Sequence, residues 1–415
     1  MSEVPDMKQA FLASRIFDGT TRDYRTKTAL LIEGLQIVAL IPQSQVPSEY
    51  QAVDLGSLSI LPGLIDCHVH LVWNGSHDPN ALLQRESNEK TAVRALLHAF
   101  EELMHGVTTV RDVGGLSNAT LAVRDATREQ LFIGPRILAA GMPIQMTGGH
   151  ARNLGLEVDG PHEARKGVRT MLRAGVDLIK LMATGGVYTE GEEPGSPQLT
   201  VEEMRAAVEE AHKAGRKVAA HAEGLQGILN ALEAGVDTIE HGNFLDEGAV
   251  QRMVAGGQIL VPTISPFYRM AQLGTEGGIP EYAARKARHV VAGSFHAVEL
   301  AKAGGVPIAA GTDDGSPKLP HGVLVYELEL LVRAGLSPGE ALSSATRVAA
   351  QACGLANQVG TLEAGKSADF IGISGDPLND ISTLRNMDTV VIRGRLVKHH
   401  GTPLIQHGSI SEVRL

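Results

Sequence analysis

Two histidines separated by one residue, His68 and His70, close an apolar stretch that begins at Ile65. Residues two apart on a β-strand point to the same face, so these two imidazoles can bind one cation together. The pair alone is weak evidence, because such histidines are more often hydrogen-bonded surface or core residues than metal ligands. The pair becomes informative only if further ligands meet it.

Four further ionisable residues lie in or at the end of other short apolar runs. They are Lys180, His221, His241 and Asp313. Imidazole and carboxylate groups are ligands that suit zinc and similar ions. If the four histidines, the lysine and the aspartate converge on one place, they predict a metal centre.

Lys180 bears on the number of metal ions. It lies inside the apolar run from Leu178 to Met182, where an ammonium group is costly to bury unless it is paired or neutralised. An acid such as Glu223 or Asp112 would pair with it. Alternatively, the neutral amine reacts with carbon dioxide to give a carbamate, a carboxylate on a long arm that can bridge two ions. Arginine could not react in this way because it is always charged. With these neighbouring ligands we predict the carbamate.

The elements that must position these residues form a repeat of helices and short apolar strands between about Leu61 and Leu362. Glycines such as Gly175 and Gly235 stand where a helix would end in a left-handed residue. The candidate strands are 65–71, 107–112, 137–140, 178–182, 218–222, 238–241, 259–263 and 306–312. Eight parallel strands joined by helices close into a barrel with functional residues at the C-terminal strand ends. We predict an α/β fold with a (β/α)8 TIM barrel over residues 62–362.

An open doubly wound sheet is the alternative architecture. It would carry a glycine-rich phosphate-binding turn after its first strand. The pairs Gly114-Gly115 and Gly185-Gly186 lack the full spacing of that turn. The barrel is therefore favoured.

Both ends of the chain have a different pattern, with short strands and glycine-bearing turns. Candidate strands are 11–17, 28–32 and 36–41 at one end and 368–373 and 389–392 at the other. Each set is too small to bury a core alone. We predict that residues 1–61 and 363–415 pair into one small β-sandwich domain.

Composition excludes several classes of function. The 415 residues carry a formal net charge of −10, which gives no electrostatic footprint for nucleic acid or anionic membranes. Only Cys67 and Cys353 are present, which suits a reducing compartment. Acidic residues in Met1 to Asp6 do not fit a signal peptide, and no apolar run is long enough to cross a bilayer. We expect a cytoplasmic protein.

The chain resembles the amidohydrolase superfamily, and within it the imidazolonepropionase-like branch with metal-dependent prolidases (Xaa-Pro dipeptidases) and carboxypeptidase-like dipeptidases. The segment from Leu61 to Leu71, LPGLIDCHVHL, is similar to the first barrel strand of that superfamily, and Leu362 to Phe370 to its return into the β-sandwich. The resemblance covers nearly the whole chain. It implies two divalent ions, with zinc expected. The implied ligands are His68 and His70 for the more buried ion, carbamylated Lys180 as the bridge, His221 and His241 for the second ion, and Asp313, which also shuttles a proton.

Two further segments resemble loops of the prolidases. Met146 to His150 and Met182 to Val187 are similar to the loops after the third and fourth strands. The resemblance implies that His150 polarises the scissile carbonyl. Related dipeptidases place a tyrosine after the seventh strand against the substrate carboxylate; here Tyr268 is displaced by about one residue, and Tyr188 is a second candidate. Recognition of a free carboxylate therefore stays open.

The expected activity is hydrolysis of an amide bond in dipeptides, Xaa-Pro first, or in N-acyl amino acids, by attack of a metal-bridging hydroxide. Hydrolysis of another amide, carbamate or urea bond, including toxin amides, is an alternative. A mononuclear deaminase or cyclic amidohydrolase is another, although one ion needs no bridging lysine. A scaffold without chemistry is disfavoured by the complete ligand set. As partners we expect a small-molecule substrate and further copies of the chain in a homo-oligomer.

The remaining motifs have simpler interpretations. Thr200 and Glu203 have the spacing of a capping box. The segment from Gly191 to Pro197 is predicted to be a mobile loop over the mouth of the barrel. Eight histidines off the strand ends are predicted to be surface or capping residues: His77, His98, His105, His212, His289, His296, His399 and His400.

Overall fold

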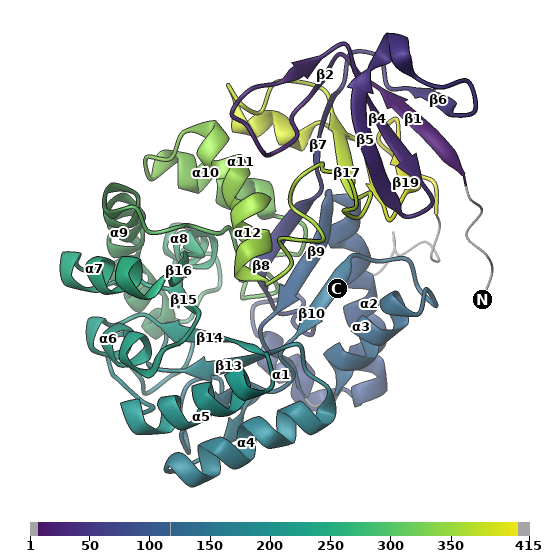
Figure 1. Cartoon of the computed structure of the whole chain (residues 1–415). Helices are drawn as coiled ribbons and strands as arrows, with labels where there is room; N and C mark the ends of the chain where they lie inside the picture. Colours follow the sequence, from purple (N-terminus) through teal and green to yellow (C-terminus); the bar gives the residue numbers. More distant parts are fainter. Residues whose placement is uncertain (1–6, 117, 406–415) are drawn as a thin grey trace.

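The computed structural model describes residues 7–116 and 118–405. Figure 1 shows an α/β body of parallel strands covered by helices, with a mainly β part built from the purple and yellow ends of the chain.

The parallel strands fall into two sheets. One has the order β10-β9-β8, and the other has the order β12-β11-β13-β14-β15-β16. Their bounds are β8 Leu64–Val69, β9 Val107–Asp112, β10 Arg136–Ala139, β11 Ile144–Gln145, β12 Leu156–Glu157, β13 Leu178–Met182, β14 Lys217–Ala222, β15 Thr238–His241 and β16 Ile259–Val261. Strands β8, β9, β13, β15 and β16 are buried at every residue, as expected where helices cover the outer face and side chains fill the inner one.

The predicted eighth strand, 306–312, is not a regular strand. It is an extended segment with isolated bridges from Ile308 to Leu260 and from Asp314 to Val69. The N–H of Ala309 donates to Leu260 O at 2.9 Å, and that of Cys67 donates to Ala310 O at 3.0 Å, so this segment lies between β16 and β8. Regular pairing is interrupted because Pro307 lacks an N–H and Asp313 has a left-handed φ of 56°. Closure into an eight-stranded barrel stays a prediction.

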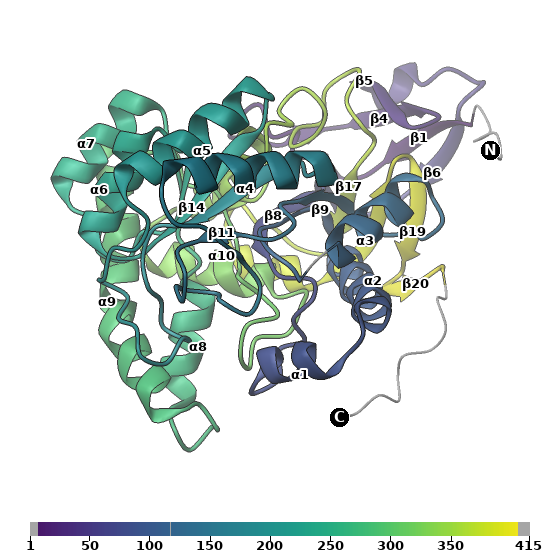
Figure 2. The ribbon, with the colours of Figure 1, turned by 90° about the horizontal axis from the view of Figure 1, so that it is seen from below.

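Helices follow the strands along the chain and lie on the outside (Figures 1 and 2). Their bounds are α1 Pro79–Arg85, α2 Asn88–Met104, α3 Ala119–Arg128, α4 Pro161–Ala174, α5 Val201–Lys213, α6 Leu225–Ala234, α7 Glu247–Gly256, α8 Ile264–Leu273, α9 Glu281–Gly304, α10 Leu324–Arg333, α11 Pro338–Ser344 and α12 Arg347–Ala352. Gly175 and Gly235 end α4 and α6 with φ of 87°, which confirms the sequence prediction at both places. The capping box of Thr200 and Glu203 begins α5.

The chain ends form two further sheets, with the orders β5-β4-β1-β6 and β20-β19-β18-β17-β7-β2-β3. Their bounds are β1 Lys8–Leu12, β2 Arg15–Ile16, β3 Arg25–Thr26, β4 Thr28–Glu33, β5 Gln36–Pro42, β6 Gln51–Asp54, β7 Ser59–Pro62, β17 Phe370–Ile373, β18 Met387–Ile392, β19 Arg395–His399 and β20 Thr402–Pro403. Strands from both ends pair directly, because β7 runs antiparallel to β17 with Pro62 opposite Phe370. The rings of Phe11 and Phe370 meet at 4.8 Å in an apolar cluster that both sheets share.

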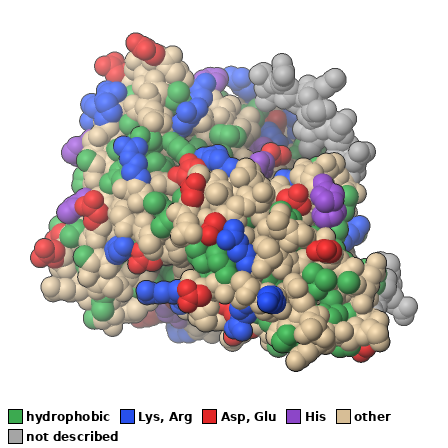
Figure 3. All heavy atoms as spheres, turned by 90° about the horizontal axis from the view of Figure 1, so that it is seen from above, with side chains coloured by type: hydrophobic (Ala, Val, Ile, Leu, Met, Phe, Trp, Pro, Cys, Tyr) green, Lys and Arg blue, Asp and Glu red, His purple; other side chains and the backbone are tan. Residues whose placement is uncertain are grey.

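Surface features agree with the composition. On the face drawn in Figure 3, basic and acidic side chains are interspersed rather than gathered by sign.

Within residues 7–116 and 118–405, no helix has both the length and the hydrophobicity that a membrane span requires.

Candidate metal centre

One cavity gathers the side chains predicted to bind metal. It is called the strand-end cavity here and is lined by His68, His70, Lys180, His221, His241 and Asp313, together with His150 and Tyr188. The six predicted ligands come from β8, β13, β14, β15 and the loops that follow strands, at distant places in the sequence. The carboxyl ends of parallel strands meet at one edge of the fold, which is why these residues converge.

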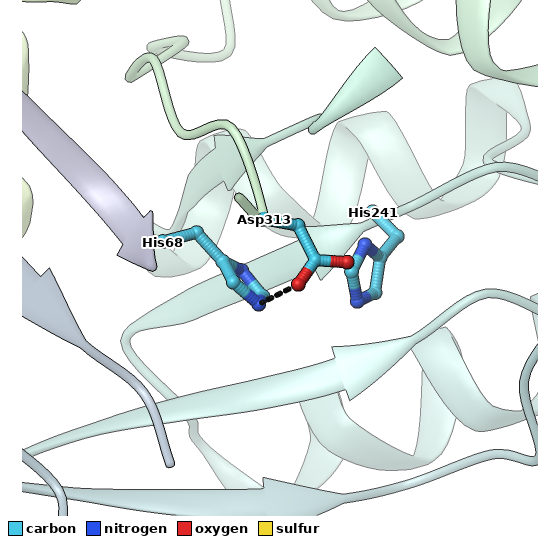
Figure 4. Close-up of side chains that lie close together, drawn as sticks. All are labelled: His68, His241 and Asp313. Atoms are coloured by element: carbon cyan, nitrogen blue, oxygen red, sulfur yellow. Dashed lines mark ion pairs between the residues drawn. The ribbon is translucent and has the colours of Figure 1, made fainter. Parts of the chain in front are cut away.

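The distances inside the cavity are those of a compact donor set. Asp313 Oδ1 lies 3.3 Å from His70 Nε2 and 3.7 Å from His68 Nε2. The ligand atoms of His68, His241 and Asp313 all lie within 4.8 Å of one another (Figure 4). The rings of His221 and His241 are 4.5 Å apart. One ion or an adjacent pair of ions could therefore contact donors from all of these strands.

Hydrogen bonds to one nitrogen of each imidazole orient the four histidines. These bonds join His68 Nδ1 to Glu240 Oε2 (2.8 Å), His70 Nδ1 to Gly114 O (2.8 Å), His241 Nδ1 to Thr263 Oγ1 (2.6 Å) and His221 Nε2 to Gly185 O (3.0 Å). Carboxylate and carbonyl oxygens only accept, so in His68, His70 and His221 the bonded nitrogen carries the proton and the other keeps its lone pair. The Thr263 hydroxyl can accept from His241 Nδ1 or donate to it, so this bond orients the His241 ring without fixing its tautomer. Burial also lowers the pKa of each ring, that of His70 to about 3, which favours the neutral form that binds metal.

Lys180 has no ion-pair partner in the described part of the chain. Its Nζ is buried and makes no hydrogen bond. The partners considered from the sequence do not reach it: Asp112 accepts the N–H groups of Leu71 and Gly114 instead, and Glu223 has its nearest ion-pair contact at His221. Burial lowers the pKa of Lys180 to about 8, so a larger fraction of the amine is neutral than for an exposed lysine.

The donor set fits metal ions. Lys180 Nζ and Asp313 Oδ1 are buried and lack hydrogen bonds within the described residues. Leaving a buried polar atom without a partner costs about 1–3 kcal/mol, so side chains arranged in this way need a partner in the cavity. Neutral imidazoles with free lone pairs, beside a carboxylate, are what a divalent cation such as zinc binds. Carbamylated Lys180 would add one more carboxylate to this set.

Three residues at the ends of extended segments around the cavity hold a left-handed backbone that non-glycine residues rarely adopt. These are His241 (φ 72°), Thr263 (φ 45°) and Asp313 (φ 56°). Such conformations persist where surrounding contacts enforce them, and they concentrate at functional sites. Here they turn the chain at the ends of β15, β16 and the segment 306–312, which brings the side chains of His241 and Asp313 into the cavity.

His150 reaches the cavity from the loop after β11. Its ring stacks on His221 at 4.3 Å, and its Nδ1 lies 3.0 Å from Thr189 Oγ1 and 3.3 Å from Glu192 Oε2. Both partners belong to the segment 185–198, which contains the predicted mobile loop. A bridge between Thr184 and Pro197 closes the base of that segment. The segment thus holds His150 beside the predicted ligands; its mobility stays a prediction.

The two candidate tyrosines lie in different surroundings. Tyr188 lines the cavity and donates its hydroxyl to His77 O. Tyr268 is not among the lining residues; its ring lies 5.0 Å from the Arg333 guanidinium, which donates to its hydroxyl. Phe267, the residue before Tyr268 on helix α8, lines the cavity instead. Successive residues of a helix are rotated by about 100°, so Tyr268 points in a different direction. The position of Tyr268 thus does not support the predicted contact with substrate.

Sequence reasoning missed several buried polar residues. Glu240, next to His241, is 0% exposed and bonds to His68. A glutamate inside an apolar strand that is buried on both faces needs a polar partner. The position of Glu240 in such a run could therefore have identified it as a functional candidate. A second buried group, Glu102, Asp314 and His321, had no signal in the sequence.

The predictions for the other histidines had mixed outcomes. His105 is the C-cap residue of α2, as predicted. His98 is half-buried rather than a surface residue: its ring stacks on His321 at 4.2 Å, and its Nδ1 bonds to Leu71 O at 2.7 Å. Helical periodicity relates only residues that are close in the chain, so it could not show that His98 would contact His321, 223 positions away.

Known proteins are similar to nearly the whole chain. The model of the Amidohydrolase family matches residues 59–397. Ochratoxinase from Aspergillus niger is 29% identical over 401 residues, covering 88% of this chain and 81% of that protein.

Solved structures agree with this assignment. A crystal structure of a Xaa-Pro dipeptidase with methionine bound in its active site superposes with a TM-score of 0.86 at 33% identity, covering 94% of this chain and all (100%) of that one. A prolidase in complex with N-methylphosphonate-L-proline gives a TM-score of 0.87 at 29% identity and covers 95% of this chain and 100% of that one. The resemblance inferred from the motifs is confirmed: the chain belongs to the amidohydrolase family and is a hydrolase.

Proposed function

We propose that the protein is a binuclear metal hydrolase, with zinc in both positions, that cleaves the amide bond of dipeptides, Xaa-Pro dipeptides first, or of N-acyl amino acids. The observation that carries the proposal is the strand-end cavity, where four neutral histidines, an aspartate and an unpaired lysine face one another. The likeness to a Xaa-Pro dipeptidase and to a prolidase supports the substrate class. We further propose that residues 62–362 close into the (β/α)8 barrel and that 1–61 and 363–415 form the β-sandwich domain.

In this proposal His68 and His70 would hold one ion and His221 and His241 the other, with Lys180 as a carbamate and Asp313 as the further ligands. When bound, the ions would supply Lewis acidity and lower the pKa of a water molecule toward neutrality, which makes a nucleophile available at neutral pH. Asp313 accepts the proton of that water and returns it to the leaving nitrogen. Its carboxylate lies at the centre of the donor set, 3.3 Å from His70 Nε2.

His150 polarises the substrate carbonyl in this proposal. Its Nδ1 faces Thr189 and Glu192, so Nε2 is the nitrogen left to donate a hydrogen bond to the carbonyl oxygen. The Thr189 hydroxyl can donate to Nδ1, which leaves the ring proton on Nε2 for the carbonyl oxygen. Stacking on His221 fixes the plane of the ring. Charge that develops on the oxygen during attack would thus meet a preorganised donor.

A hydrolysis screen tests the function. Purified protein is assayed against Ala-Pro, Met-Pro, N-acetyl-proline and N-acetyl-methionine, with and without a chelator, and its metal content is measured. Hydrolysis that the chelator abolishes and zinc restores, together with two metal ions per chain, is the expected result. One ion per chain, with turnover of a cyclic amide or an aminated heterocycle instead, would establish the mononuclear alternative.

The carbamate has its own test. Intact-protein mass spectrometry under non-denaturing conditions, after purification with zinc and bicarbonate, should show the added mass of one carbon dioxide. The matched control is Lys180→Arg, which cannot form a carbamate. An unmodified Lys180 in the fully metal-loaded enzyme would remove the bridge from the proposal.

A toxin amide is the second candidate substrate, because ochratoxinase is among the relatives. Aromatic side chains on the cavity wall, Trp73, Tyr188 and Phe267, offer flat apolar surfaces to an aromatic substrate. Ochratoxin therefore belongs in the same screen. A higher kcat/KM for ochratoxin than for every dipeptide would replace the dipeptidase assignment.

A further inference from the structure

A wholly buried ion pair stands behind one of the predicted metal ligands. Arg111 Nη2 on β9 donates to Glu240 Oε1 and Oε2 at 2.8 and 2.9 Å, and His68 Nδ1 donates to Glu240 Oε2 at 2.8 Å. Arg111, Glu240 and His68 are each at most 1% exposed. Arg111 also donates to Cys67 O and to Thr238 Oγ1. The carboxylate is therefore held from two sides and cannot turn away from the histidine.

This arrangement makes His68 unlike the other three histidines. His70 and His221 bond to backbone carbonyls, those of Gly114 and Gly185, and His241 bonds to the hydroxyl of Thr263. Another carboxylate near these rings, outside the donor set, is that of Glu223, whose Oε1 lies 3.6 Å from His221 Nε2, beyond hydrogen-bond distance. His68 thus has a charged partner at hydrogen-bond distance where the other three have neutral ones.

A charged partner changes an imidazole as a ligand. A carboxylate that accepts the Nδ1 proton fixes the tautomer, holds the ring plane and raises the electron density at Nε2, the nitrogen that faces Asp313. Removing such a partner typically weakens metal binding by roughly 10–100-fold. A neutral carbonyl or hydroxyl fixes the ring but supplies less electron density. The two halves of the donor set should therefore differ in affinity.

We propose that Glu240, held by Arg111, is a positioning residue that makes the His68–His70 position the tighter of the two metal positions, so that the centre fills stepwise, this position first. The inference rests on the proposed binuclear function and adds to it an order of metal loading. Glu240 touches neither substrate nor metal in this account; it acts through His68.

A purely structural role is the competing explanation. Arg111 and Glu240 join β9 to β15, and Arg111 reaches β8 through Cys67 O, so the ion pair could serve only to hold three strands together. Breaking a buried pair leaves one charge uncompensated, which destabilises a fold whatever the effect on metal. The double variant Arg111→Met with Glu240→Gln separates the two roles. It removes both charges, which relieves the uncompensated charge, but it does not restore the carboxylate at His68.

Cobalt(II) titration of the metal-free enzyme, followed by visible absorbance and by competition with a chelator, measures the two binding steps. Wild-type protein should bind two ions with affinities at least about tenfold apart. Glu240→Gln and the double variant should both weaken the tight step by about 10–100-fold and leave the second step nearly unchanged. Thr263→Val, the matched control on the His241 side, should weaken the second step instead.

The outcomes separate this inference from the proposed function. Equal affinities in the wild type, or tight binding regained in the double variant, would overturn the role of Glu240 even if dipeptides are hydrolysed. Stepwise loading that is lost in both Glu240 variants, without hydrolysis of any substrate in the screen, would support the inference and refute the proposed substrates. Thermal unfolding of each metal-free variant shows whether a change in affinity accompanies a loss of fold.

Discussion

Replacing Gly186 with alanine should disable His150 while leaving the metal ligands in place. A Cβ added at Gly186 would lie 2.2 Å from His150 Cε1 and 2.7 Å from both ring nitrogens. Carbon atoms at optimal separation stand about 3.5 Å apart, so the ring must retreat by roughly 1.3 Å. A misplacement of about 1 Å in a positioned group can cost roughly 10²-fold in rate, or about 2.7 kcal/mol of transition-state stabilisation.

The assay is kcat/KM for the best dipeptide of the screen, measured beside metal content and thermal unfolding. Gly186→Ala should lose about 10²-fold in kcat/KM with near-normal metal content. Gly195→Ala is the matched control in the same loop, because a Cβ there meets nothing within 4 Å. Adding His150→Ala to Gly186→Ala should cost little more, since both changes remove the same group.

Two results would refute this reasoning. Activity of Gly186→Ala close to that of Gly195→Ala would mean that the ring of His150 has no part in turnover or can move at no cost. A loss of metal as large as the loss of activity would mean that the clash is passed on to His221, on which the ring stacks.

Further predictions concern the proton carrier, pH and the metal. Asp313→Asn should keep metal content near normal while kcat falls by orders of magnitude; retained turnover would assign proton transfer to another group. Burial raises the pKa of Glu327 to about 7 from its ordinary 4.5. The folded state therefore favours its protonated form, and the free energy of unfolding should fall by roughly 3 kcal/mol as pH rises from about 4 to about 8. Other buried acids such as Asp112 contribute in the same direction, so Glu327→Gln should reduce the pH dependence measured in denaturant titrations by about this amount. An unchanged pH dependence would exclude Glu327 as a source. Removing metal with a chelator should lower the Tm, because ions at about 100 times their Kd stabilise the folded state by roughly 2.7 kcal/mol; an unchanged Tm would contradict ligation within the fold.

Part of the site was predictable because its signals are local. An apolar run that ends in a histidine or an aspartate marks a strand end, and the spacing of His68 and His70 puts both on one face. A glycine such as Gly175 marks the end of a helix because it adopts a left-handed φ, here 87°, without strain. Each of these depends on residues that are neighbours in the chain.

The segment 306–312 and Tyr268 show what local sequence patterns cannot predict. The run 306–312 has the composition of a strand, but Pro307 and the turn at Asp313 interrupt its pairing. Tyr268 lies one residue from a position that faces the cavity, and a single helical step of about 100° carries it to Arg333 instead. Composition does not resolve a shift of one residue.

The amino-acid sequence by itself determined the family, the alternation of strands and helices, and the types of donor that stand at the strand ends. Only the tertiary structure decided which distant residues meet: His68 with Glu240, 172 positions away, and Cys67 with Cys353, whose sulfurs lie 3.8 Å apart. The physical reason is the distance along the chain over which each effect acts. Backbone geometry and side-chain periodicity act over a few residues, whereas the partner of a buried polar group is selected by the packing of the whole chain.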